Sequence, residues 1–278
     1  MNIFLLQTLN GEIVDEEVLK VKYMIDKYLL EFGDYSPYSY KLINTNQLKN
    51  LEKKFYDIPL YSCIPIGDFT FVNEFLKIIN SNSNVISSIP NIQVPKSLQD
   101  KEFLGRDYAK IEIKNNEIVK CEGTKLYKKI PNHYIFIKEN KIKGFTFLAH
   151  PNNLNLQDGD YIISECVDII SEYRIFVRNK IVGVQFYDGD CTVFPDIEKI
   201  NKIILKLKTE KQYDIMNQSC YCLDVAVIKN NQKLDTVLIE MSPVICIGTY
   251  RFCNPILLRM YIKSYEWSLN NITYRSLT

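Results

Sequence analysis

The pattern of apolar and polar residues changes near residue 95. Before that point, short apolar runs alternate with segments whose apolar residues recur every three or four positions, which is the spacing of one helix face. The apolar runs are Ile3–Leu6 and Pro59–Ile66, and the segments with helical spacing are Glu16–Phe32 and Phe71–Ile79. Alternating strands and helices predict a small α/β domain with a partly parallel sheet over residues 1–95. A polar loop at residues 80–84 precedes Pro90 and Pro95, which suit a linker.

After residue 103 the chain changes to strand pairs that flank polar turns. These pairs are Ile111–Lys114 with Glu117–Lys120, Glu172–Val177 with Ile181–Phe186, and Tyr221–Ile228 with Thr236–Met241. Two such runs around a polar turn are typical of antiparallel hairpins. Helical spacing returns at Ile197–Lys208 and again from Pro255 to Leu269. We therefore predict an α+β second part that is built on antiparallel sheets.

The last predicted hairpin brings two carboxylates together. If residues 229–235 form its loop, Gln232 is the centre, and Asp224 and Glu240 face each other with Cβ atoms about 5 Å apart. Like charges among apolar neighbours are destabilising there unless a cation lies between them, and oxygen ligands suit Mg²⁺ or Mn²⁺. Ser242 shares the face of Glu240 and adds a hydroxyl. The alternatives are a solvated sheet face or a register that slips by one or two residues.

Basic residues gather in two places. Tyr134–Lys138 is an apolar strand that ends in a lysine, and Lys141 and Lys143 follow closely. Several ammonium groups around one loop repel each other unless an anion or solvent separates them, and phosphate is a natural partner. Arg106 and Lys110 form a second candidate pair. In both places the alternative is a solvated basic surface.

Two further segments have the composition of a nucleotide site. Residues 161–168 are apolar and then polar, so they are a candidate edge for binding an adenine through the main chain, with Asp168 on the ribose. The alternative is a buried strand that is followed by a turn. Glu172 and Arg174 alternate with apolar residues and therefore share one face of a strand. Arg174 can neutralise charge only if that face lines the site.

Composition excludes several other classes of function. The net charge is +1, which gives no electrostatic reason to expect nucleic acid or an anionic membrane as a partner. Eight cysteines form no CxxC pair and only two histidines are present, so a zinc site is poorly supported and reduced thiols are expected. The N-terminal residues do not resemble a signal peptide, and no apolar run is long enough for a transmembrane helix. A cytoplasmic protein is expected.

Taken in order, these motifs resemble the ATP-grasp superfamily, and most of all its phage and bacterial clade named for two arginines and a lysine. The matching segments are Phe136–Lys138, Lys143–Thr146, Ser171–Val177, Leu223–Val225, Leu238–Glu240 and Ile247–Tyr250. Cys63–Phe69 is similar to a segment of the clade's N-terminal domain, and the stretch from Pro95 to Arg106 is similar to its inter-domain region.

The resemblance implies an ATP-grasp fold in three parts. A small α/β pre-ATP-grasp domain covers residues 1–95, an N-subdomain covers 96–163, and a C-subdomain with the metal site covers 164–278. The two α+β subdomains hold ATP between antiparallel sheets. The resemblance also implies a reaction in which a carboxylate attacks the γ-phosphate of ATP and an amine then displaces phosphate from the acyl phosphate. The carboxylate and the amine would belong to an amino acid, peptide or protein.

The resemblance also implies roles for individual residues. Lys138 and Lys143 would hold the phosphates, and Arg174, with Lys143, would act in catalysis by stabilising the transferred phosphoryl group. The remaining nucleotide-binding candidates are Arg106, Glu165, Cys166, Val167, Asp168 and Glu172, of which residues 165–167 would form the adenine hinge. Asp224, Glu240 and Ser242 would bind Mg²⁺ or Mn²⁺.

The sequence departs from the clade's pattern at three positions. The last metal position is usually Asn and is Ser242 here, which is a shorter and weaker ligand. Glu139 stands where the clade has proline, and Phe147 stands where it has glycine. A carboxylate–amine ligase therefore competes with two alternatives: a nucleotide-binding interaction protein that has lost turnover, which Ser242 favours, and an unrelated ATP-dependent phosphotransferase whose hairpin carboxylates bind metal.

Overall fold

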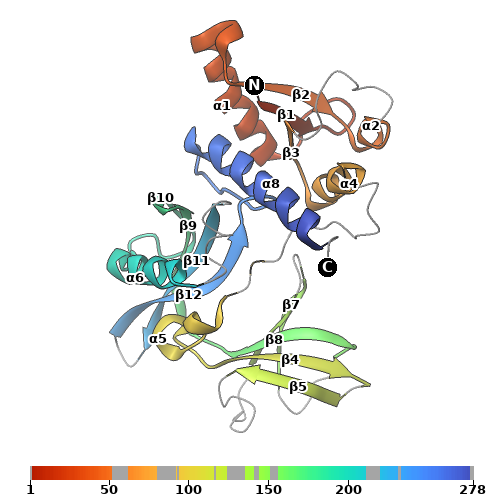
Figure 1. Cartoon of the computed structure of the whole chain (residues 1–278). Helices are drawn as coiled ribbons and strands as arrows, with labels where there is room; N and C mark the ends of the chain where they lie inside the picture. Colours follow the sequence, from red (N-terminus) through yellow and green to blue (C-terminus); the bar gives the residue numbers. More distant parts are fainter. Residues whose placement is uncertain are drawn as a thin grey trace.

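The computed structural model describes residues 2–51, 62–79, 92, 94–115, 117–123, 135–140, 144–150, 156–210, 220–230 and 233–275. Within these residues the strands form three separate sheets, and each sheet belongs to one part of the chain (Figure 1). None of the described helices is both long enough and apolar enough to cross a membrane.

The N-terminal part is a parallel sheet in the order β2-β1-β3. Its strands are β1 (Asn2–Gln7), β2 (Tyr38–Ile43) and β3 (Cys63–Ile66), and its helices are α1 (Glu16–Phe32), α2 (Thr45–Lys49) and α4 (Phe69–Ile79). The side chain of Asp15 caps α1 by accepting hydrogen bonds from the backbone N–H groups of Glu17 and Val18. The predicted α/β architecture is confirmed, although residues 59–61 of the predicted second strand lie outside the described residues.

The middle part is an antiparallel sheet in the order β5-β4-β8-β6-β7. Its strands are β4 (Tyr108–Lys114), β5 (Glu117–Gly123), β6 (Ile135–Glu139), β7 (Thr146–Ala149) and β8 (Gly159–Glu165). Two short helices precede it, η3 (Lys96–Leu98) and α5 (Lys101–Leu104). The sheet has a small apolar core of its own, which includes Ile111, Ile137 and Ile163.

The last part is an antiparallel sheet in the order β10-β9-β11-β12, with two helices. The elements are β9 (Ile169–Arg178), β10 (Lys180–Gly189), α6 (Ile197–Lys208), β11 (Tyr221–Asn230), β12 (Lys233–Pro243) and α8 (Ile256–Arg275). Tyr173, Ile175 and Val177 on β9 belong to the same buried cluster as the apolar residues of α6. Because side chains alternate along a strand, Arg174 lies on the opposite face.

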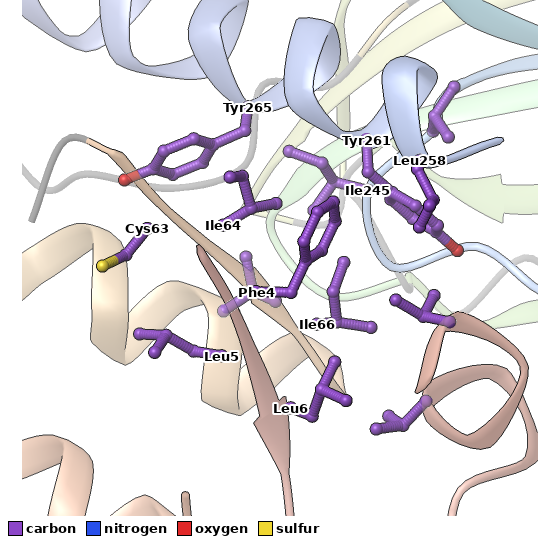
Figure 2. Packing of buried hydrophobic residues seen from close by; sticks show 14 of the residues in the cluster. Phe4, Leu5, Leu6, Cys63, Ile64, Ile66, Ile245, Leu258, Tyr261 and Tyr265 are labelled. Carbon is purple, nitrogen blue, oxygen red and sulfur yellow. The ribbon is translucent and has the colours of Figure 1, made fainter. Parts of the chain in front are cut away.

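Helix α8 joins the last part of the chain to the first. Its residues Leu258, Tyr261 and Tyr265 share one buried cluster with Phe4 and Ile64 of the N-terminal sheet. Figure 2 shows these side chains filling the space between the helix and the strands. The N-terminal sheet and the C-terminal helix therefore share a single core. Helices and antiparallel sheets that follow an α/β unit confirm the predicted fold class.

Candidate active site

A cavity of about 400 Å³ lies between the middle sheet and strand β12. Strands β6 and β8 supply lining residues from the middle sheet, β12 supplies those opposite, and residues 245–248 and Tyr250 complete the lining. Five of the predicted site residues line it: Arg106, Lys138, Arg174, Glu240 and Ser242. The two sheets that were expected to hold a nucleotide therefore do enclose a common space.

Asp224 and Glu240 are cross-strand partners, as predicted, but the register has a different origin. The turn pairs Asn230 with Lys233, and a regular ladder from that turn would place Ile239 opposite Asp224. Instead, Val225 pairs with Leu238 and Asp224 pairs with Glu240, so Ile239 is the extra residue of a β-bulge. The predicted pairing of Asp224 with Glu240 is confirmed, and the β-bulge is what brings the two residues opposite each other.

Asp224 is almost fully buried and forms a bidentate ion pair with Arg174 of the neighbouring strand β9. Arg174 donates from Nε to Oδ1 at 2.7 Å and from Nη2 to Oδ2 at 2.6 Å. Burial raises the pKa of Asp224, Arg174 opposes this, and the nearby Glu240 adds to it. Although burial disfavours the charge of Arg174, Asp224 raises the pKa of that guanidinium. Sequence reasoning missed this pair, because only the strand order places β9 beside β11.

Glu240 is paired with a base from the opposite wall. The ammonium group of Lys138 on β6 donates a hydrogen bond to Oε2 of Glu240. The charged groups therefore form one row, Arg174–Asp224–Glu240–Lys138, that runs from strand β9 across the cavity to the middle sheet. Among the residues that the structure describes, each carboxylate has one basic partner, and the two carboxylates meet in the centre.

Two tyrosines that the sequence did not single out as site residues surround Arg174. The ring of Tyr250 lies 4.9 Å from the guanidinium carbon and the ring of Tyr187 lies 6.0 Å from it. The rings stack on each other with centroids 4.6 Å apart. Burial, together with the nearby Asp224 and Glu172 carboxylates, raises the pKa of Tyr187. Arg174 also donates from Nη1 to the carbonyl of Gly248 at 2.5 Å, so its orientation is fixed on several sides.

The carboxylate pair and Ser242 fit a divalent cation. Glu240 and Ser242 line the cavity with oxygen atoms, which Mg²⁺ and Mn²⁺ prefer. Asp224 is the cross-strand neighbour of Glu240, and both of its carboxylate oxygens accept hydrogen bonds from Arg174. Within the described part of the chain, no group of three or more His, Cys, Asp or Glu residues could hold a metal. A cation here would therefore be completed by oxygen atoms from a ligand, as is usual for Mg²⁺ with phosphates.

Comparison with known proteins shows which family this chain belongs to. Residues 108–259 match the sequence model of the ATP-grasp domain that describes family 2 of the clade named for two arginines and a lysine. The chain belongs to this family. That range contains every predicted site residue except Arg106, and the match confirms the resemblance that the sequence motifs indicated.

A solved structure with a TM-score above 0.5 shows the same fold. The D-alanine–D-alanine ligase from Bacillus anthracis complexed with ATP is 12% identical, with a TM-score of 0.52, and the match covers 99% of this chain and 98% of that one. The macrocyclase MdnC from Microcystis aeruginosa, bound with the precursor peptide MdnA, is 13% identical with a TM-score of 0.46 over 98% and 100% of the two chains. Comparison with curated protein sequences finds no match.

The predicted adenine hinge, residues 165–167, lies outside the lining of the cavity described above. Glu165 ends β8, and its carboxylate accepts hydrogen bonds from the backbone N–H of Asp107 at 2.8 Å and from Lys101 at 3.4 Å. Cys166 and Asp168 are exposed, and Val167 packs against the hairpin of β11 and β12. The role of these residues in nucleotide binding stays a prediction.

The remaining candidates differ in how the structure places them. Lys143 lies outside the described residues. Glu172 is half-buried on the face of Arg174, and burial together with Asp188 raises its pKa. The guanidinium of Arg106 is buried at the cavity wall and donates to three backbone carbonyls, contacts that no motif in the sequence predicts.

A second cavity of about 560 Å³ adjoins the first. It lies between the N-terminal domain and the segment at residues 245–248, and that segment lines both cavities. Its acidic side chains are Asp15, Glu17 and Asp68, which stand at or near the N-termini of α1 and α4. Glu17 accepts a hydrogen bond from the hydroxyl of Thr249. The N-terminal domain therefore reaches the loop that fixes Arg174.

Proposed function

We propose that this ATP-grasp protein is an ATP-dependent ligase that joins a carboxylate to an amine through an acyl phosphate. The row of charges Arg174–Asp224–Glu240–Lys138 carries the proposal. Phosphoryl transfer requires charge neutralisation and alignment rather than a protein nucleophile. A row that holds two bases on the outside and two acids in the centre offers sites for phosphate oxygens and for a divalent cation side by side.

In the proposed complex the ion pairs exchange partners. Asp224, Glu240 and Ser242 would hold Mg²⁺, which would offset the negative charge of the phosphates. Lys138 would turn from Glu240 to the phosphates, which Lys143 would also bind, and Arg174 would stabilise the transferred phosphoryl group. The Bacillus anthracis ligase, a protein of the same fold, is complexed with ATP, which supports a nucleotide as the ligand.

The acceptor carboxylate would attack the γ-phosphorus, and the bond between that phosphorus and the bridging oxygen would break to release ADP. The amine would then attack the acyl carbon. A C–N bond would form, the acyl–oxygen bond would break, and phosphate would leave as the amine loses its proton. Since the second cavity adjoins the first at residues 245–248, we place the carboxylate and amine substrates there. Enclosure between domains would protect the acyl phosphate from water.

Release of ADP tests the proposal. The protein is incubated with Mg-ATP and pools of amino acids, peptides or cell extract, and ADP is measured together with mass changes in the pool. A ligase releases ADP and phosphate only when both substrates are present, and hydroxylamine traps its acyl phosphate as a hydroxamate. A phosphorylated product that is stable to hydroxylamine would instead indicate a phosphotransferase.

Ser242 favours a second candidate, a nucleotide-binding interaction protein without turnover. A serine hydroxyl is a weaker metal ligand than the amide that the clade usually has. Such a protein would bind ATP in a calorimetric titration but release no ADP with any pool. The variant Ser242→Asn distinguishes the candidates further, because it restores turnover only if weak metal binding is what limits the protein.

A further inference from the structure

Arg106 lies where the middle sheet meets the edge of the last one. Helix α5 ends at Leu104, and the capping residue Gly105 adopts a left-handed conformation with φ 64°. A Cβ atom at Gly105 would lie 2.5 Å from the side chain of Val237 and 2.7 Å from that of Ile228. The close approach of Gly105 to strands β11 and β12 therefore requires glycine. It also places the next residue, Arg106, beside strand β12.

The guanidinium of Arg106 binds main-chain carbonyls on both sides of this junction. Nη1 donates to the carbonyls of Leu104 at 3.0 Å and Leu238 at 3.2 Å, and Nη2 donates to the carbonyl of Ile239 at 3.2 Å. Two of these carbonyls belong to the β-bulge. Among the described strands β12 is an edge strand, so the bulge carbonyls have no further strand to pair with.

We propose that Arg106 is a positioning residue: by holding the bulge at Ile239, it keeps Glu240 on the same face as Asp224. The proposal rests on the proposed function, in which that carboxylate pair binds the metal. Without the bulge, the ladder that starts at Asn230 and Lys233 would place Ile239 opposite Asp224. Glu240 would then lie opposite Leu223, on the face that packs against α6.

This role differs from phosphate binding, which the sequence suggested for Arg106. A phosphate ligand acts mainly through its charge, so lysine replaces it in part. A residue that bridges three carbonyls acts through the planar fork of its donors, which a lysine does not reproduce. Lysine and methionine substitutions therefore separate the two roles.

Hydrogen exchange measures the bulge in the protein without nucleotide or metal. We expect amides in residues 237–243 to exchange at least about tenfold faster in Arg106→Met and in Arg106→Lys, because the bulge carbonyls of Leu238 and Ile239 lose their donor. Arg259→Met, at an exposed position on α8, is the control and leaves exchange in this segment unchanged. If the methionine variant does not fold, the lysine variant, which keeps the charge and most of the side chain, carries the test.

Binding measurements then connect the bulge to the metal. We expect the affinity for Mn²⁺ in the presence of ATP, followed by electron paramagnetic resonance, to fall roughly tenfold in both variants. Affinity for ATP in EDTA stays within about twofold of the unsubstituted protein, because the charge of Arg106 is not used on phosphate.

Three outcomes would overturn or redirect the inference. Unchanged exchange at residues 237–243 in both variants would refute the positioning role. Loss of ATP affinity in EDTA for methionine, with retention for lysine, would identify Arg106 as a phosphate ligand. If the unsubstituted protein binds no Mn²⁺ with ATP, the proposed function fails, and the exchange measurement still decides whether Arg106 holds the bulge.

Discussion

At the scale of single residues, the two central carboxylates differ in their surroundings. The side chain of Asp224 is 5% exposed and has a bidentate partner, whereas that of Glu240 is 35% exposed and has one lysine. A buried ion pair that loses one partner leaves an uncompensated charge, whereas a half-exposed pair is screened by solvent. The same chemical change at the two positions should therefore have the same effect on catalysis and different effects on stability.

We predict that Asp224→Asn and Glu240→Gln both abolish turnover of Mg-ATP, since each removes one charge from the metal pair. Asp224→Asn also lowers the free energy of unfolding by about 3–5 kcal/mol, because Arg174 stays buried without a carboxylate. Glu240→Gln changes it by less than about 1 kcal/mol. Urea unfolding and ADP release measure the two effects. Near-normal turnover in both variants would refute the metal assignment.

Cys166 offers a direct test of the predicted adenine hinge. It is exposed, as are Cys121, Cys191 and Cys253, which lie elsewhere and serve as internal controls. If adenine binds the hinge main chain, ATP slows alkylation of Cys166 several-fold and leaves Cys121 unchanged. Peptide mass spectrometry after brief maleimide treatment measures each site. If ATP binds without protecting Cys166, the predicted hinge is wrong, and the adenine would instead contact the apolar walls of the first cavity.

The carboxylate pair also shows how far the sequence alone can lead at this scale. The assumed centre, Gln232, led to the correct partner for Asp224 although the turn itself has a different register. One extra residue at the bulge made up the difference, and nothing in the alternation of Leu238 and Ile239 indicates a bulge. The partners of Arg174 and Lys138 were not predictable, because they depend on which strands and sheets become neighbours.

At the scale of elements, the segment at residues 248–250 connects helix α1 with strand β9. The carbonyl of Gly248 accepts from Arg174, the hydroxyl of Thr249 donates to Glu17, and the carbonyl of Tyr250 accepts from Lys20 at 3.3 Å. Tyr250 has a φ of 49°, a conformation that is uncommon outside glycine. Contacts from two elements therefore hold a locally unfavourable backbone in place.

We predict that Thr249→Val lowers the rate of ligation roughly tenfold or more while the affinity for ATP stays unchanged. Valine has the shape of threonine but cannot donate to Glu17, so the Gly248 carbonyl loses part of the support that orients Arg174. Thr249→Ser keeps the hydroxyl and should retain turnover within about twofold. ADP release at saturating substrates, together with calorimetric titration of ATP, gives both quantities. Full turnover in the valine variant would show that the contact is not needed.

Element prediction from the sequence succeeded where periodicity was strong. Helices α1, α4 and α6 and the three hairpins lie where the spacing of apolar residues placed them. Strand β2 was not foreseen, because only its ends, Tyr38 and Ile43, are buried and its alternation is short. Residues 15–18, 66–70 and 245–248 all line the second cavity, and nothing in the sequence indicates that these three stretches meet.

At the scale of the whole molecule, the N-terminal sheet is not a separate unit of packing. Its cluster extends through Ile245 and Leu258 to Tyr265 of α8, as Figure 2 shows. The middle sheet, in contrast, has its own smaller cluster. The predicted boundary near residue 95 therefore marks a change in secondary structure, while the core joins the first and last parts of the chain.

The shared core predicts that a substitution in the N-terminal sheet also destabilises the C-terminal part of the chain. Trp267, the only tryptophan in the sequence, lies on α8 and reports unfolding of the C-terminal part by its fluorescence. Phe4→Ala leaves a cavity between the N-terminal sheet and α8 and should cost about 3–5 kcal/mol. Because the N-terminal sheet and α8 share one core, the urea concentration at the midpoint of the Trp267 fluorescence change should fall. This is expected although residue 4 lies at the other end of the chain.

A matched control separates a shared core from general destabilisation. Ile137→Ala is an equally buried change in the separate cluster of the middle sheet, and it should shift the Trp267 midpoint much less than Phe4→Ala does. Equal shifts in the two variants would indicate that the whole chain unfolds as a single cooperative unit. No shift with Phe4→Ala would mean that the N-terminal sheet unfolds independently of α8, and the shared cluster would then contribute little to the stability of the C-terminal part.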